Sequence, residues 1–136
     1  MAIKIYLDTN IILEHALQRK NYLQVSEVFH LAELEIIQCY TSASTFFTIA
    51  FFLKKEQNSK NIFKSYFSFI KTITTSEESL LNAVNSSFID IEDAFHYYSA
   101  INLCDYFLTF NKKDFIKHSN KRLPCLTPGE FLKIME

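Results

Sequence analysis

Short apolar runs alternate with longer amphipathic stretches along this chain. The first run, Ile3–Leu7, ends abruptly at the polar triplet Asp8-Thr9-Asn10, as a buried strand does before a turn and a helix. Similar runs predict further strands at residues 36–40, 72–75, 106–108 and 123–126. The last of these contains Pro124 and suits the edge of a sheet.

Helices are predicted where apolar residues recur every three or four positions. They start near residue 11, cover 22–34, run from 41 or 42 to about 55, and cover 58–70 and 91–103. Further helices start near 76 and 127, with a short piece near 111–115. Thr127-Pro128-Gly129-Glu130 is a typical helix start. This order predicts one α/β domain over residues 1–136, with a mostly parallel central sheet and helices on both faces.

The amino-acid composition limits the possible folds, partners and cellular locations of this chain. One Gly and two Pro in 136 residues argue against an all-β sandwich. A net charge of −1 means that any contact with nucleic acid must be local or shared with a partner. The three cysteines are far apart in sequence, which favours a reduced, cytoplasmic location. We see no signal peptide and no apolar run long enough to cross a membrane.

Polar residues gather where the predicted strands end. Asp8 follows the first strand, Glu92-Asp93 begins the late helix, and Thr109 with Asn111 and Asp114 follows the 106–108 strand. Ligands of such sheets bind beyond the carboxyl ends of the strands, so we expect Asp8 and Asp93 to converge there. Crowded carboxylates repel one another, and Mg²⁺ or Mn²⁺ relieves this while activating water for attack on a phosphodiester.

At these residues the chain resembles the PIN-domain family, especially the toxin ribonucleases of VapBC-type toxin–antitoxin pairs. The matching segments are LDTNIIL at 7–13, TSAS at 41–44, IEDAFHYYSA at 91–100, CDYFLTFNKKDF at 104–115 and LPCLTPGEFL at 123–132. The resemblance implies a three-layer α/β sandwich and cleavage of RNA with Mg²⁺ or Mn²⁺, leaving a 5′-phosphate. It also implies a homodimer and a small antitoxin protein that plugs the active site.

The resemblance assigns roles residue by residue. Asp8 and Asp93 match the metal-binding acids of the family. The other expected catalytic residues are Asn111 and Asp114, and the expected supporting residues are Thr9, Asn10, Glu92 and Thr109. Two positions depart from the pattern: Thr48 stands where the family usually has a helix Glu, and Phe110 stands where many members have Arg.

Simpler interpretations of the same residues stay open. Asp8 could cap the first helix, Asp93 could complement a helix dipole, and Asn111 and Asp114 could be turn residues. His96 could approach the site or only pack. The phenylalanines at 46, 47, 51 and 52 could form core or an interface, and the Lys112-Lys113 pair could contact substrate.

Two other functions compete with the ribonuclease. The chain could be a catalytically weakened PIN-like scaffold that binds protein or RNA, as the absent Glu and Arg suggest. It could also be a phosphatase or phosphoacceptor domain with Asp8 as nucleophile. A haloacid-type phosphatase needs a second Asp two positions on, and Asn10 stands there. A receiver domain needs an acidic pair and a late Lys, and Asp8 stands alone.

Overall fold

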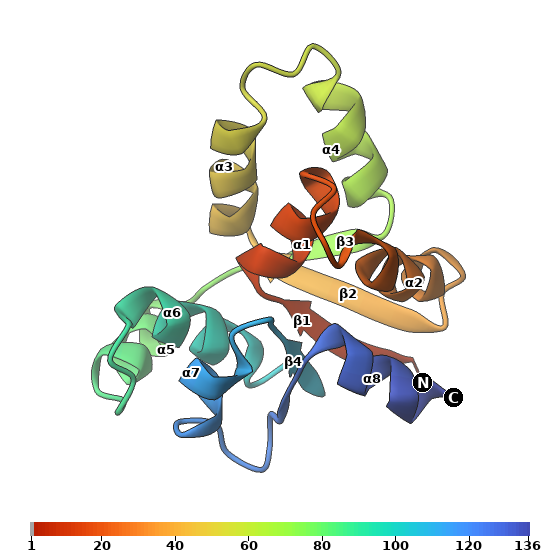
Figure 1. Cartoon of the computed structure of the whole chain (residues 1–136). Helices are drawn as coiled ribbons and strands as arrows, with labels where there is room; N and C mark the ends of the chain where they lie inside the picture. Colours follow the sequence, from red (N-terminus) through yellow and green to blue (C-terminus); the bar gives the residue numbers. More distant parts are fainter. Residues whose placement is uncertain (1) are drawn as a thin grey trace.

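A five-stranded, entirely parallel sheet forms the centre of the protein (Figure 1). The structure is a computed structural model and describes residues 2–136. The strands run in the order β3-β2-β1-β4-β5, and each neighbouring pair is parallel. Their bounds are β1 Ile3–Leu7, β2 Ile37–Ser42, β3 Ile70–Ile73, β4 Tyr106–Leu108 and β5 Cys125–Leu126.

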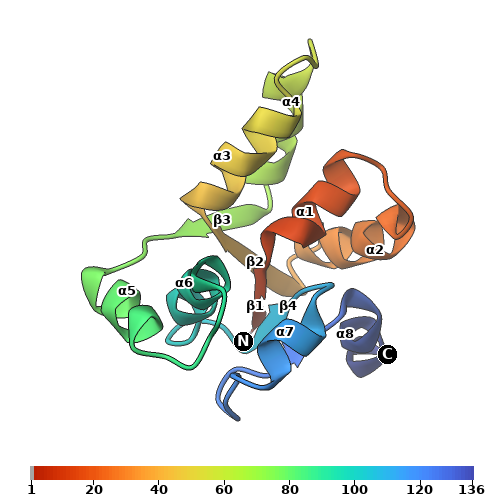
Figure 2. The ribbon, with the colours of Figure 1, turned by 60° about the vertical axis from the view of Figure 1, so that its left-hand side comes forward.

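Helices cover both faces of this sheet, so the predicted three-layer α/β sandwich is confirmed. They are α1 Thr9–Ala16, α2 Tyr22–Glu33, α3 Ala43–Phe52, α4 Ser59–Phe67, α5 Glu77–Val84, α6 Ile91–Ala100, α7 Lys112–Ile116 and α8 Pro128–Met135. In Figure 2, α1, α2 and α8 lie on one side of the sheet, and α5 and α6 lie on the other. None of the helices within residues 2–136 has both the length and the apolar character needed to cross a membrane.

The alternation of side chains along β1 supplies both cores. Ile5 and Leu7 point into a core built with α1, α2, α3 and α8, whereas Tyr6 points into a second core with α6 and α7. All three side chains are fully buried. A central strand covered on both faces is apolar at most positions. Ile3–Leu7 is apolar except for Lys4 near its start, and this is why it was recognisable from sequence.

The predicted boundary between α4 and β3 is wrong, and several other helix and strand ends differ from the prediction by up to three residues. The stretch 58–70 was expected to be helical, but α4 ends at Phe67 and Ile70 begins β3. Ile70 is 2% exposed and pairs with Cys39 of β2. The apolar spacing from Ile62 to Ile70 fits a helix period, yet burial of Ile70 against the sheet outweighs it. The predicted strand at 72–75 therefore begins two residues earlier.

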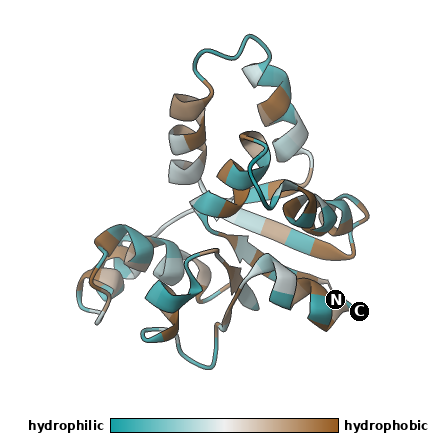
Figure 3. Cartoon of the chain, in the orientation of Figure 1, coloured by the Kyte–Doolittle hydropathy of each residue, from teal (hydrophilic) through white to brown (hydrophobic). Residues whose placement is uncertain are grey.

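The helices α3 and α4 project from the body of the protein as a pair (Figure 2), and both carry hydrophobic residues among polar ones (Figure 3). Phe46 is buried and contacts Phe63 and Phe67 edge-on. By contrast, Phe47 is 77% exposed, Phe51 is 64% exposed and Phe52 is 47% exposed. The phenylalanine cluster thus divides between the core and an open surface, which we call the aromatic arm.

Candidate functional site

The turn after β1 holds Asp8 at the carboxyl end of the sheet. The Asp8 backbone N–H donates to the Leu108 carbonyl at 3.0 Å, which ties the end of β1 to the end of β4. The Asp8 carboxylate is the N-cap of α1 and accepts the Thr9 N–H at 2.8 Å. Asp8 therefore does cap α1, but the cap uses only one of its two carboxylate oxygens.

The second oxygen of Asp8 is held by the residues that sequence analysis named as supporting groups. The Thr109 hydroxyl donates to Oδ2 at 2.7 Å, and the Asn10 side-chain amide donates to it at 3.3 Å. Asn10 also donates to the Thr109 hydroxyl and accepts the Phe110 N–H. These contacts fix the orientation of the carboxylate, as outer hydrogen bonds do for metal ligands.

Burial works against ionisation of Asp8. The side chain is 5% exposed, and its desolvation raises its pKa above the ordinary value, with a further small rise from the negative charge of Glu92. The neighbouring His96 and the hydrogen bonds from Thr109 and Thr9 act in the opposite direction. A nearly buried carboxylate with its donors on one side is suited to receive a cation on the other.

The start of α6 brings a second group of carboxylates to the same edge of the sheet. Asp90 is the N-cap and accepts the N–H groups of Glu92 and Asp93. Partial burial raises the pKa of Asp93 to about 7, and the charges of Asp90, Asp8, Asp114 and Glu92 add to the rise, in that order. The negative charge of Asp8 therefore acts on Asp93, so that ionisation of one carboxylate disfavours ionisation of the other.

Asp93 opens into a cavity of about 290 Å³ that we call the acidic cleft. Its lining includes two further carboxylates, two lysines and an aromatic pair: Phe88, Ile89, Asp90, Asp93, Lys113, Asp114, Lys117 and His118. His118 stacks against Phe88 and shares a hydrogen bond of 2.7 Å with the Ser87 hydroxyl. The cleft joins α6 to α7, so carboxylates and cations from distant parts of the chain meet there.

The remaining predicted residues take different places. Asp114 lines the acidic cleft, whereas Asn111 is exposed at the start of α7 and its backbone N–H donates to the Thr109 hydroxyl. Glu92 lies at the edge of a separate cavity. Sequence analysis did not select Asp90, although an Asp directly before an apolar helical stretch is a recognisable N-cap signal.

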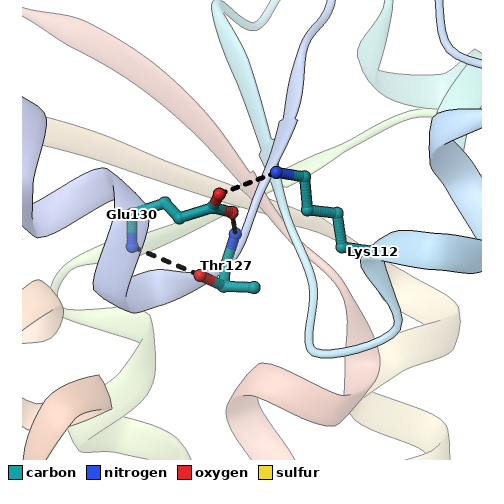
Figure 4. Close-up of polar contacts among 3 residues, drawn as sticks. All are labelled: Lys112, Thr127 and Glu130. Atoms are coloured by element: carbon teal, nitrogen blue, oxygen red, sulfur yellow. Dashed lines mark hydrogen bonds and ion pairs between the residues drawn. The ribbon is translucent and has the colours of Figure 1, made fainter.

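Lys112 is engaged with α8 (Figure 4). Its ammonium contacts Glu130 Oε2 at 2.7 Å. The other carboxylate oxygen of Glu130 accepts the Thr127 N–H, and the Thr127 hydroxyl accepts the Glu130 N–H. The predicted capping box is thus present and is extended by an ion pair. Of the Lys112-Lys113 pair, only Lys113 faces the acidic cleft.

A buried hydrogen-bonded chain lies behind Asp8. His96 is 4% exposed; its Nδ1 lies 2.7 Å from the Tyr6 hydroxyl, and its Nε2 lies 3.5 Å from the Thr9 hydroxyl. Thr9 in turn contacts the buried hydroxyl of Thr45. His96 therefore both packs in the core and reaches the turn that carries Asp8, so the two interpretations of this residue are compatible.

The two departures from the family pattern leave no charge in their places. Thr48 is exposed on α3, and its hydroxyl donates to the Ser44 carbonyl of its own helix. Phe110 is partly buried against the core that contains α1 and α2. Thr48 therefore adds no carboxylate to the site, and the groups that bond the Asp8 carboxylate are the Thr109 hydroxyl, the Asn10 amide and the Thr9 N–H.

The donor set fits a hard cation that keeps part of its water shell. Within residues 2–136, three or more His, Cys, Asp or Glu side chains nowhere form a group that could hold a metal ion by themselves. Mg²⁺ commonly uses only one or two carboxylates plus water, and the mutually repelling pair Asp8 and Asp93 matches that requirement. A zinc site, which needs three or four protein ligands, does not match.

Comparisons with known proteins agree with this fold. The family model described as "PIN domain" matches residues 4–113 of the chain. A solved structure of VapBC2 from Rickettsia felis, bound to a DNA fragment from its own promoter, matches with a TM-score of 0.69 at 14% identity. The match covers 92% of this chain and 98% of that chain, and at this identity it shows the fold alone. None of the curated proteins matches the chain.

Proposed function

The chain belongs to the PIN-domain family, and from this premise we propose that it is a divalent-metal-dependent endoribonuclease, the toxin of a toxin–antitoxin pair. One contact carries the proposal: Thr9, directly after Asp8, lies 3.5 Å from His96 of α6, one helical turn after Asp93. The negative charge of Asp8 also contributes to the raised pKa of Asp93. A cation held between two such carboxylates relieves their repulsion.

Each residue has a role in this proposal. Asp8 and Asp93 would hold the ion, which would supply an activated water and neutralise charge on the phosphodiester. Thr9, Asn10 and Thr109 keep the Asp8 carboxylate in one orientation. Asp114 would orient the attacking water from the wall of the acidic cleft, and Asn111 would assist it from the exposed start of α7.

The acidic cleft also contains positive charge for the RNA backbone. Lys113 and Lys117 line it together with Asp93, and lysines contact phosphates without reading sequence. This local arrangement reconciles RNA binding with a net charge of −1 for the whole chain.

The proposal includes protein partners. The solved neighbour is a VapBC assembly, and by analogy the present chain is inhibited by a small antitoxin protein. The exposed phenylalanines of the aromatic arm, Phe47, Phe51 and Phe52, pair with a second copy of the chain, since contiguous exposed apolar side chains mark interaction surfaces. The protein would act in the cytoplasm, where its RNA substrates are.

Cleavage of a labelled RNA by the purified protein tests this function. We expect cleavage with Mn²⁺ or Mg²⁺, leaving a 5′-phosphate, and none with excess chelator. Asp8→Asn and Asp93→Asn should each lower the rate by more than about 100-fold, since loss of outer-sphere groups alone costs metal sites 10- to 100-fold.

Asp105→Asn is the matched control. Asp105 accepts the Lys4 N–H at the opposite end of β1, and an Asn oxygen can keep that bond. We expect wild-type cleavage in this variant. Metal-dependent cleavage that survives in Asp93→Asn would contradict the proposal.

The second candidate is a PIN-like scaffold that binds RNA or protein without cutting. It is favoured by the exposed Thr48, which adds no carboxylate, and by Lys112, which is already paired with Glu130. RNA binding without any metal-dependent cleavage, equally strong in wild type and Asp93→Asn, would support this alternative over the nuclease.

A further inference from the structure

A second cavity, of about 410 Å³, lies beside α6, which is within the size range of small-ligand sites. We call it the hydroxyl pocket. It is formed by Ser42 and Ser44 at the start of α3, Thr75 before α5, and Glu92, Phe95 and Ser99 of α6. Since Glu92, Phe95 and Ser99 line this pocket while Asp90 and Asp93 line the acidic cleft, α6 separates the two cavities.

The hydroxyl pocket is linked to the turn that holds Asp8 through one buried histidine. His96 also lines it, and its Nε2 lies 3.5 Å from the Thr9 hydroxyl. The Thr9 N–H donates directly to Asp8. Glu92 is the neighbour of Asp93 in sequence and contributes to its raised pKa. A group bound in the pocket would therefore contact Glu92, the sequence neighbour of Asp93, and His96, which contacts the sequence neighbour of Asp8.

Leu80 and Ile91 make part of the lining apolar. The Ser42 and Ser44 hydroxyls bond each other at 2.7 Å, which leaves one of their two protons free.

The remaining polar groups are acceptors. The Ser99 hydroxyl donates to the Phe95 carbonyl at 2.6 Å, so the Thr75 hydroxyl must be the donor in its 2.8 Å contact with Ser99. The protons of both hydroxyls are thus used, and only their lone pairs face a ligand. The Glu92 carboxylate can only accept when ionised. A matching ligand must bring donors.

The same lining disfavours a phosphate group. Neither Lys nor Arg is among the described residues around the pocket, and the Glu92 carboxylate would repel an anion. The partly exposed ring of Phe95 instead provides a face on which a flat heterocycle can stack. The RNA backbone is therefore expected over the lysines of the acidic cleft, with an uncharged base entering the hydroxyl pocket.

We propose that the hydroxyl pocket binds a guanine base of the RNA substrate, adjacent to the scissile phosphate; this rests on the proposed nuclease function. Guanine presents two neighbouring donors, N1–H and the N2 amino group, on its Watson–Crick edge, and one carboxylate accepts both. The other three bases place an acceptor beside their donor, which Glu92 would repel. Phe95 stacks on the base and Glu92 reads it.

Binding of short oligoribonucleotides tests the pocket without requiring cleavage. The probes are fluorescently labelled UUGUU and UUAUU, measured by anisotropy with the full chain in buffer containing Ca²⁺. We expect the wild type to bind UUGUU about tenfold more tightly than UUAUU, as for one bidentate contact. Glu92→Gln should bring this ratio close to one, and Phe95→Leu should weaken both probes by about fivefold.

Glu56→Gln, an exposed residue in the loop between α3 and α4, is the matched control and should keep the wild-type ratio. Because the ratio is taken within each variant, a small loss of folded protein does not affect it. Equal affinity of the wild type for both probes, or a guanine preference that Glu92→Gln leaves unchanged, overturns the proposal.

Cleavage of the same probes in Mn²⁺ separates the two proposals. Guanine preference in binding without any cleavage would leave the pocket in place as a base-binding site and defeat the nuclease function. Equal cleavage rates for UUGUU and UUAUU would contradict the guanine-binding pocket and support the nuclease function.

Discussion

Asp93 carries a carboxyl group whose ionisation the fold opposes. Its pKa is raised to about 7, first by burial and then by the surrounding carboxylates, whereas the ordinary value is 3.8. Between these two pH values the folded protein binds a proton that the unfolded chain has released. The free energy of unfolding of the metal-free protein should therefore fall as the pH rises from about 4 to 7.

Replacing Asp93 by Asn should remove this penalty. At pH 8 we expect Asp93→Asn to raise the free energy of unfolding of the metal-free protein by about 1 kcal/mol, a value reduced for the solvent screening of a half-exposed group. At pH 4 the variant and the wild type should be equally stable. Urea unfolding at the two pH values, with Asp105→Asn alongside, measures the difference; equal stability at pH 8 would contradict the raised pKa.

The Tyr6 hydroxyl is hydrogen-bonded to groups beneath the turn that carries Asp8. It accepts the Ser42 N–H at 3.1 Å and contacts His96 Nδ1 at 2.7 Å, and all three groups are buried. Tyr6→Phe leaves both partners unsatisfied and should lower the free energy of unfolding by about 1–3 kcal/mol. In Tyr98→Phe the loss should be negligible, because the Tyr98 hydroxyl has no hydrogen-bond partner among residues 2–136. Thermal unfolding compares the two; a smaller loss in Tyr6→Phe than in Tyr98→Phe would argue against this network.

The sequence alone was enough to locate some of the site residues but not others. Asp8, Thr9, Asn10 and Thr109 directly follow adjacent strands, and the hydrogen bonds of a parallel pair bring such segments together. Asp90 has a recognisable N-cap signal, but its effect on Asp93 acts through space and leaves no motif in the sequence. Glu92 was expected beside Asp93, yet one residue along a helix turns a side chain by about 100°, and it lines the neighbouring cavity.

Helix α8 depends on its N-terminal cap. The Thr127 hydroxyl accepts the Glu130 N–H, and Glu130 returns a bond to the Thr127 N–H while also binding Lys112. Thr127→Ala should cost about 1 kcal/mol of stability, as for other N-cap truncations. Chemical denaturation measures this, with the exposed Thr74→Ala as a control that should cost almost nothing. Equal losses in both variants would show that the cap contributes no stability.

The start of an element could be predicted where the local residues carry a start signal. A boundary that depends on pairing between two distant strands could not be predicted. The Thr127-Pro128-Gly129-Glu130 sequence fixes the start of α8 by local chemistry, and the structure has the helix there. The boundary between α4 and β3 has no such signal: it depends on Ile70 pairing with Cys39, a contact between residues far apart in the chain. Local periodicity cannot contain that information.

The aromatic arm should determine the association of the protein. Phe47 and Phe51 lie one helical turn apart on α3 and are both more than half exposed. We expect the wild type to have the mass of two chains in light scattering after size exclusion, and the Phe47→Ser/Phe51→Ser variant to have the mass of one. Leu81→Ser, which changes an exposed apolar side chain on α5, should leave the dimer intact. A dimer that persists in the double variant would exclude this surface.

The arrangement of strands as β3-β2-β1-β4-β5 decides where the site lies. It puts β1 between β2 and β4, so that Asp8 meets the Thr109 segment on one side and the β2–α3 junction on the other. Sequence predicted parallel strands with a site at their carboxyl ends, but it did not predict the order of the strands. The two cavities flanking α6 could not be foreseen, because they depend on how helices from distant segments pack together.

The central claim is that Asp8 and Asp93 share one divalent cation. Isothermal titration of Mn²⁺ into the purified protein at pH 7.5 tests it directly, using the wild type, Asp8→Asn, Asp93→Asn and the control Asp105→Asn. We predict binding to the wild type and to Asp105→Asn, and an affinity at least about tenfold weaker in each of the other two variants. Unchanged Mn²⁺ affinity in Asp8→Asn and Asp93→Asn would contradict the claim.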